Sequence, residues 1–231
     1  MVGKWTGVRL VVVAVGVLLT IPGAAQNSGL TGGQVQAIVA ACGAAAQATA
    51  SPLRGAGKFT KMWCAVVNRE GELRAIQATD TGGTPQNPAG SDAWRGSIEI
   101  AIAKAFTAVA FSSNDLALDS KTIGLLARPD GPGSTAASDI GTNVGVAPLF
   151  GIGTTNPYRP GTGHTPQDDA VGVRHRGIVT FAGGQPVYSK PGGVCDGGVL
   201  LGAVGVSGDG VDQDDEVAKA AVLNANLCLT P

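Results

Sequence analysis

The sequence contains few aromatic and few charged residues. Aromatic residues make up 4% and charged residues 14% of the 231 positions, so small residues must supply most of the core, packed closely over a wide area. The 16 basic and 17 acidic residues nearly balance, and they form no run of lysine or arginine. The sequence therefore lacks the electrostatic pattern of a nucleic-acid-binding protein. No segment has the pattern of a membrane-surface helix.

A long apolar run is also missing. The stretch from Leu10 to Leu19 is nearer to a dozen residues than to the roughly 20 that a membrane-spanning helix needs. The basic residues Lys4 and Arg9 precede this stretch, and the small residues Gly23, Ala24 and Ala25 follow it. This order is typical of a secretory signal. We therefore expect residues 1–25 to be a signal peptide and the protein to be secreted or periplasmic, with no membrane span after cleavage. An uncleaved anchor is the alternative. Residues 26–231 have the length of a single domain.

The four cysteines show none of the short spacings of a zinc knuckle or a redox dithiol. They are Cys42, Cys64, Cys195 and Cys228. In an exported chain this pattern favours disulfides, for which three connectivities exist. We favour Cys42–Cys228, because the two residues are expected on the first and last helices. Cys64 is interpreted as a buried strand residue and a free thiol.

Helical periodicity recurs in four parts of the chain. Apolar residues at helical spacing predict helices over 31–50, 94–105, 114–127 and 211–223. In the second of these helices one buried face is predicted, formed by Trp94, Ile98, Ala101, Ile102 and Ala105.

Short β-prone runs predict the strands. They cover 61–68, 72–79, 144–152, 177–182, 185–189 and 198–207, and the first two are joined as a hairpin at 69–71. Glycine and proline are concentrated at about 128–172, which we interpret as an insertion that serves as a binding loop, lid or interface. Antiparallel strands with helices placed between them predict an α+β sandwich.

Several segments resemble one known family. GGQPVY (183–188), a turn and GVLLGAVGVSGDGVDQDDEVAKAA (198–221) resemble the C-terminal signature of the HbpS/GlcG-like haem-binding proteins, and of the related PduO C-terminal-type domain. CAVVNREGELRAIQATD (64–80) resembles the family's first hairpin, and AKAFTAVAFS (103–112) its central helix. The resemblance implies a profilin-like layered sandwich, with an antiparallel sheet of about five strands covered by helices. It further implies a homo-oligomer, and an extracellular or periplasmic protein that captures haem.

If the chain binds haem, the iron needs an axial histidine, methionine, cysteine or tyrosine. The nitrogen donors are His164, inside the insertion, and His175. Arg174, next to His175, is placed to pair with the haem propionates. The alternative for both histidines is a solvated loop position. The remaining candidates are Tyr158, Tyr188 and Met62, of which Met62 is expected to fill the core.

Four further residues match family positions. Lys104 lies on an apolar helix face, where it either extends to the surface or pairs with a carboxylate such as Asp80 or Asp214. Asp214 and Asp215 open the last helix, where the helix dipole also favours acidic residues. Some relatives carry a histidine at this acidic pair, and this chain does not. The acidic cluster of this region lacks the spacing of a calcium loop, so no metal is assigned; it consists of Asp209, Asp212, Asp214, Asp215 and Glu216.

The leading hypothesis is an exported protein that sequesters or senses haem or a small tetrapyrrole-like ligand. One alternative is an enzyme on the same fold, with Lys104 and an acidic residue as acid and base. Another is an oligomeric interaction protein that uses the insertion. The chain has no G-x-S-x-G elbow, and no catalytic residue is assigned. Glycines 202, 205 and 208 have the wrong spacing for a dinucleotide fingerprint and indicate close packing in the sheet.

Overall fold

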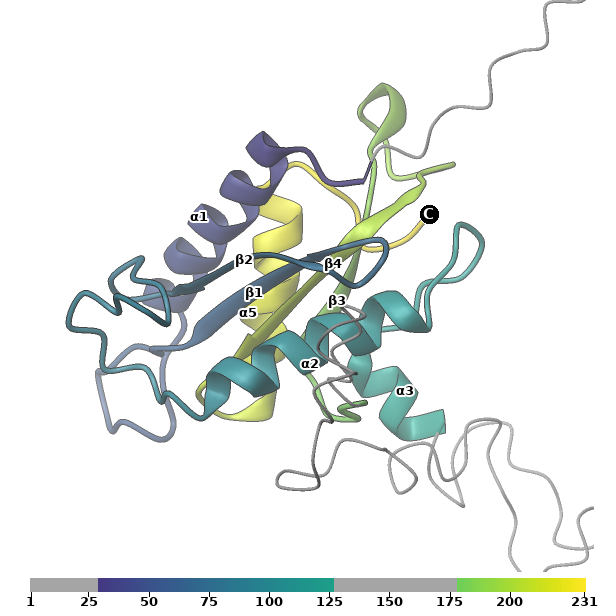
Figure 1. The fold of residues 1–231 in the computed structure, drawn as a ribbon. Helices are drawn as coiled ribbons and strands as arrows, with labels where there is room; N and C mark the ends of the chain where they lie inside the picture. Colours follow the sequence, from purple (N-terminus) through teal and green to yellow (C-terminus); the bar gives the residue numbers. More distant parts are fainter. Residues whose placement is uncertain (1–28, 127–177) are drawn as a thin grey trace, which may run out of the picture.

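The computed structural model describes residues 29–126 and 178–231, and it has the predicted α+β architecture (Figure 1). The expected signal peptide, the whole insertion at 128–172 and the strand expected at 144–152 lie outside the described residues. The division into a signal peptide and one domain with an insertion therefore stays a prediction.

The described residues contain one sheet of four antiparallel strands in the order β2-β1-β4-β3. The strands are β1 (Trp63–Asn68), β2 (Leu73–Ala78), β3 (Gly184–Tyr188) and β4 (Leu200–Ser207). The hairpin between β1 and β2 is confirmed. It turns at Gly71, whose φ of 80° favours glycine. A fifth strand is not found among these residues.

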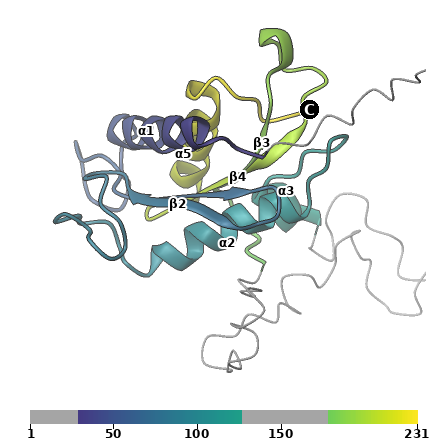
Figure 2. The same ribbon diagram turned by 45° about the horizontal axis from the view of Figure 1, so that its top comes forward.

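Helices cover both faces of the sheet, as Figure 2 shows. Helices α1 (Gly32–Ala48) and α5 (Val211–Asn224) lie side by side on one face. On the other face lie α2 (Ser97–Ala110) and the short helix α3 (Ser120–Leu126). The sheet is thus the middle layer of a sandwich.

Both faces of β1 are buried, so its side chains alternate between two cores. Cys64 and Val66 pack in the core under α1 and α5. On the other face, Trp63 and Ala65 pack against α2. At Gly205 of β4 an added Cβ would collide with backbone atoms of α2, so the helix lies directly on the strand. This contact confirms that close packing explains the glycine.

Helix α1 follows its prediction because its ends are encoded locally. The Thr31 side chain accepts the Gln34 N–H, and the Gln34 side chain accepts the Thr31 N–H, which forms a capping box. The predictions for α2 and α3 are partly wrong. Helix α2 begins only at Ser97, and Trp94, expected in its buried face, is 52% exposed before it. Helix α3 begins at Ser120 rather than at 114.

The strand expected at 177–182 is also wrong, since residues 178–182 form no strand. Side chains of the neighbouring helices take up its backbone groups instead. The Val179 N–H donates to Thr107 Oγ1, and the Phe181 carbonyl accepts the Ser120 hydroxyl. Because these groups are occupied by side chains, the run leads into β3 without forming a strand of its own.

The disulfide joins Cys195 to Cys228, so the predicted Cys42–Cys228 bridge is wrong. Cys228 follows α5 and exchanges two backbone hydrogen bonds with Tyr188, which brings it beside the loop that carries Cys195. Cys42 points into the core and its thiol contacts Cys64. The prediction that Cys64 is a free thiol is confirmed, and Cys42 is free as well.

We expect Cys195→Ser to lower the free energy of unfolding by about 2–3 kcal/mol, because the bridge closes a loop spanning 33 residues. Urea unfolding of the variant and the wild type measures the difference. A reducing agent should destabilise the wild type by a similar amount and leave the variant unchanged. Equal stabilities with and without reductant would contradict the bridge.

Candidate functional site

The described site is built around a lysine in the middle of helix α2. Lys104 has 0% of its surface exposed, although it is charged. Its ammonium donates hydrogen bonds to Asp214 Oδ2 at 2.6 Å and to the Val206 carbonyl at 3.0 Å. The Phe181 ring centre lies 4.7 Å from Nζ, which adds a cation–π contact. Lys104 is therefore a buried ion-pair partner and does not extend to the surface.

Asp214 reaches Lys104 from the first turn of α5. Its second carboxylate oxygen accepts the Asp209 N–H at 3.2 Å. Burial raises the pKa of Asp214 and lowers the pKa of Lys104, because it penalises both charged forms, and their mutual attraction opposes each shift. Of the two partners considered for Lys104, Asp214 is confirmed and Asp80 is wrong.

The Gly183–Gly184 turn encloses this ion pair. Gly183 has a φ of 110°, and a Cβ there would lie 2.9 Å from Lys104 Nζ. Ser120 holds the turn, since its hydroxyl accepts the Gly184 N–H and donates to the Phe181 carbonyl. The GG of the GGQPVY segment thus allows the chain to pass over a buried lysine. Sequence reasoning named these glycines as part of a segment that resembles the family, and missed Ser120 and Phe181.

Asp215 points to different partners from its neighbour. It accepts hydrogen bonds from Gln185 at 2.7 Å and from Lys219 at 2.8 Å. The bond with Asp215 raises the pKa of Lys219. Gln185 was also missed, although a polar residue in an apolar strand such as β3 is a usable signal. Because Asp214 and Asp215 diverge, they form no shared metal site. Within residues 29–126 and 178–231, no group of three or more acidic, histidine or cysteine side chains is arranged to hold a metal ion.

A chain of polar contacts leads from the ion pair to a pocket. Asp209 accepts the Ser51 hydroxyl at 2.5 Å, and its carboxylate lies 4.0 Å from the Arg54 guanidinium Nε. Arg54 lines a pocket of about 560 Å³. Asp80 lines the same pocket, and its carboxylate accepts the Ser91 hydroxyl at 2.6 Å and the Asp92 N–H at 3.0 Å. Asp209 therefore connects the buried pair with the surface.

The described residues do not present an axial ligand for haem iron. Met62, Cys42 and Cys64 are buried in the core, which confirms the expectation for Met62. Tyr188 is buried, and its hydroxyl lies 2.7 Å from the Ser113 carbonyl. The candidate donors His164, His175 and Tyr158, together with Arg174, lie outside the described residues. The described part of the chain offers cationic side chains that suit the carboxylates of haem. It offers no free side chain that could ligate the iron.

The burial of Lys104 also limits its chemistry. A general acid or base must reach its substrate within hydrogen-bonding distance, directly or through one water. Lys104 is enclosed by Asp214, Phe181 and the glycine turn, so in this conformation it holds elements together.

Among the described helices, none combines the length and apolarity that a membrane crossing requires.

Comparison with known proteins gives a consistent result. A family model described as "Haem degrading protein HbpS-like" matches residues 30–223. The solved structure of Klebsiella pneumoniae ORFY is similar at 22% identity, covering 86% of this chain and 91% of that one, with a TM-score of 0.50. This likeness supports the fold.

Two further solved structures have lower TM-scores. The PduOC:Heme complex matches at 20% identity over 88% of this chain and 99% of that chain, with a TM-score of 0.48. HbpS matches at 22% identity over 92% and 97%, with a TM-score of 0.42. No curated protein matches the sequence.

Proposed function

Because the chain belongs to the family of haem-degrading HbpS-like proteins, we propose that it binds haem outside the cytoplasm and sequesters or senses it there. The observation that carries the proposal is the family match, which spans residues 30–223 and so includes every described helix and strand except the last residue of α5. The Cys195–Cys228 disulfide supports export, because such bonds persist in oxidising compartments.

The proposed haem-binding residues have different roles. His164 and His175 are the proposed axial ligands, and Arg174 is proposed to pair with a propionate. Asp80 is a proposed wall of the pocket. Haem would supply the iron chemistry. Lys104, Asp214 and Asp215 are proposed to hold α2, β3 and α5 in place around the ligand, since Lys104 of α2 pairs with Asp214 of α5, and Asp215 of α5 bonds to Gln185 of β3.

Hemin titration tests the proposal. We expect purified protein to produce a saturable shift of the Soret band at micromolar concentration. The absence of any shift would overturn haem binding.

The two histidines are tested one at a time. We expect His164→Ala or His175→Ala to displace the Soret band of the bound state, because loss of an axial nitrogen changes the iron's ligand field. The absorption spectra of both hemin-loaded variants measure this, and Tyr158→Phe is the matched comparison. Unchanged spectra in both histidine variants would contradict histidine ligation and move the ligand to Tyr158 or another group.

The family's description favours haem degradation as a second candidate. The hemin-loaded protein tests it directly, with ascorbate as the electron donor and dissolved oxygen as the oxidant. Decay of the Soret band with release of iron to a ferrous chelator would support turnover. A stable band, compared with hemin on serum albumin, would support binding alone.

Sedimentation of the same sample tests the proposed homo-oligomer.

A further inference from the structure

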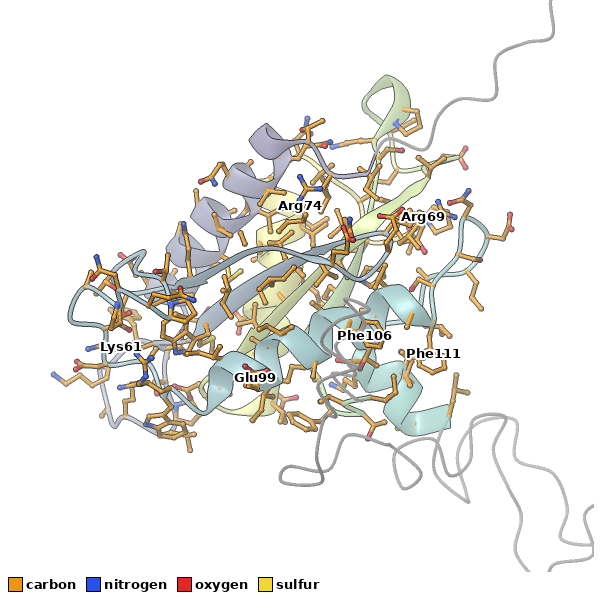
Figure 3. All side chains as sticks on the ribbon, viewed as in Figure 1. Lys61, Arg69, Arg74, Glu99, Phe106 and Phe111 are labelled. Atoms are coloured by element: carbon orange, nitrogen blue, oxygen red, sulfur yellow. A yellow bond between two sulfur atoms is a disulfide. The ribbon has the colours of Figure 1, made fainter. Side chains whose placement is uncertain are left out.

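The pocket introduced above lies where α1 ends and β2 ends. Its volume of about 560 Å³ is within the usual range for small-molecule sites. We call it the cationic pocket, and the lining residues that matter here are Arg54, Lys58, Lys61, Phe59, Gln47 and Asp80. Lys61 marks this end of the molecule in Figure 3, and Arg69 lies toward the other end of the β1–β2 hairpin. The pocket therefore lies away from the β1–β2 turn.

The charge of the pocket favours an anion. Three of its lining side chains are cationic and one is acidic. The carboxylate of Asp80 already accepts two hydrogen bonds from its own loop. Lys61 pairs with Asp92, but the Asp92 side chain is 69% exposed, so water weakens this attraction. Lys58 is exposed, and no ion pair is found for it among the described residues.

Arg54 is held in position at this pocket. Its Nη2 donates to the carbonyl of Asp92 at 3.1 Å and to that of Lys61 at 3.4 Å. Its Nε is buried and has no hydrogen-bond acceptor within the described part of the chain, although the Asp209 carboxylate lies 4.0 Å away and offsets part of its charge. The two carbonyl contacts fix the guanidinium beside the pocket, where an anionic ligand would add a charge-assisted contact.

Two aromatic rings lie exposed beside these cations. Phe59 lines the pocket and is 53% exposed. Trp94 is 52% exposed, and its ring centre lies 5.9 Å from the Arg54 guanidinium carbon. Exposed rings next to cations suit a ligand that combines carboxylates with a flat apolar body.

We propose that the cationic pocket binds the propionate edge of a dicarboxylate tetrapyrrole, with Lys58 and Arg54 on the carboxylates and Phe59 against the macrocycle. This inference rests on the proposed function. None of the described lining residues is a histidine, methionine, cysteine or tyrosine, so the contacts proposed for this pocket are with the carboxylates and the ring and not with the iron. Metal-free protoporphyrin is therefore a ligand of this pocket as well as haem.

The test uses two porphyrins and one charge reversal. Lys58→Glu should weaken binding of both hemin and metal-free protoporphyrin by about tenfold or more, because it replaces a charge-assisted contact with repulsion. Lys190→Glu is the control for an added negative charge, since Lys190 lies outside the lining of the pocket, and it should change either affinity less than about twofold. Soret absorption reports hemin binding, and porphyrin fluorescence reports the metal-free ligand.

A second arm removes the carboxylates from the ligand. Protoporphyrin dimethyl ester, in the same detergent-containing buffer, should bind the wild type about tenfold more weakly than the free acid, and Lys58→Glu should not change its affinity. Phe59→Ala should weaken binding of the acid and the ester alike. Circular dichroism and thermal melting confirm folding of each variant, and Lys58 is exposed enough to be replaced without loss of packing.

The outcomes separate this inference from the proposed function. Hemin binding by the wild type with unchanged affinity in Lys58→Glu would overturn the pocket assignment and leave haem binding intact. Binding of hemin without binding of metal-free protoporphyrin would do the same, because iron would then dominate recognition. If the wild type bound neither porphyrin, the proposed function would fail and this inference with it.

Discussion

Replacement of Lys104 with methionine is expected to lower the free energy of unfolding by about 3–5 kcal/mol, because the buried carboxylate of Asp214 would lose its cation. Urea unfolding followed by circular dichroism measures the loss. Lys121→Met is the matched control. Lys121 pairs with Asp212 at 3.6 Å on the surface, and loss of such a pair should change stability by about 1 kcal/mol or less.

A double variant tests the reason for this loss. Asp214→Asn removes the unpaired charge and keeps an oxygen for the Asp209 N–H. The combination of Lys104→Met with Asp214→Asn should therefore recover most of the lost stability. If the double variant is as unstable as Lys104→Met alone, the uncompensated charge is not the cause, and lost packing of the lysine chain is.

The same pair makes a pH-dependent contribution with a definite sign. The raised pKa of Asp214 means that the folded state resists ionisation, so the wild type loses stability relative to the double variant as pH rises from about 4 to that raised pKa. The lowered pKa of Lys104 gives a corresponding loss as pH falls from about 10.4 to that lowered pKa. The measurement is the free energy of unfolding of the wild type and of the double variant at a series of pH values. The wild type should exceed the double variant by the smallest amount at pH values between the pKa of Asp214 and the pKa of Lys104. A largest advantage at neutral pH would contradict these shifts.

Replacement of Gly205 with alanine is expected to destabilise the fold by about 3 kcal/mol or more. The new Cβ would collide with the Ala101 carbonyl and the Ala105 nitrogen, and backbone atoms of a helix cannot turn away as a side chain can. Helix α2 would have to lift from β4, which also disturbs Lys104 on the same helix. Urea unfolding again measures the effect.

The matched control is the same substitution at Gly33 in α1. A Cβ there meets nothing within 4 Å, and alanine is the better helix former by about 1 kcal/mol. Gly33→Ala should therefore stabilise the protein slightly, so the two glycine replacements have opposite signs. Similar effects on stability at both positions would mean that each replacement changes only backbone entropy. Helix α2 would then not lie directly on β4.

The elements predicted well are those whose pattern is local. Helix α1 carries its own capping box, and α5 has a consistent helical period with acidic residues in its first turn. Strands β1, β2 and β4 lie within the predicted ranges, and β3 begins one residue before its range, at Gly184. The strand predicted at 177–182 failed because it relied on β-prone composition alone. Side chains of Thr107 and Ser120, more than 50 residues away in the chain, bind its backbone instead.

The candidate site was predicted as a set of residues and not as an arrangement. The family resemblance indicated Lys104, Asp80, Asp214 and Asp215, but no spacing in the chain shows which carboxylate reaches the lysine. The cationic pocket was not predicted, since its basic residues look like ordinary surface residues in the sequence. Trp94 was expected in a buried helix face because its spacing fits the period, although the helix starts only after it.

The sequence by itself determined the α+β class, the family, most helices and strands, and the thiol state of Cys64. These properties depend on local periodicity, on capping and on recognisable segments. Only the tertiary structure decided that Lys104 pairs with Asp214, that Cys195 bonds to Cys228 and that Arg54 faces a pocket. The physical reason is that each of these contacts joins separate segments, and the order of strands in the sheet sets which of their side chains meet.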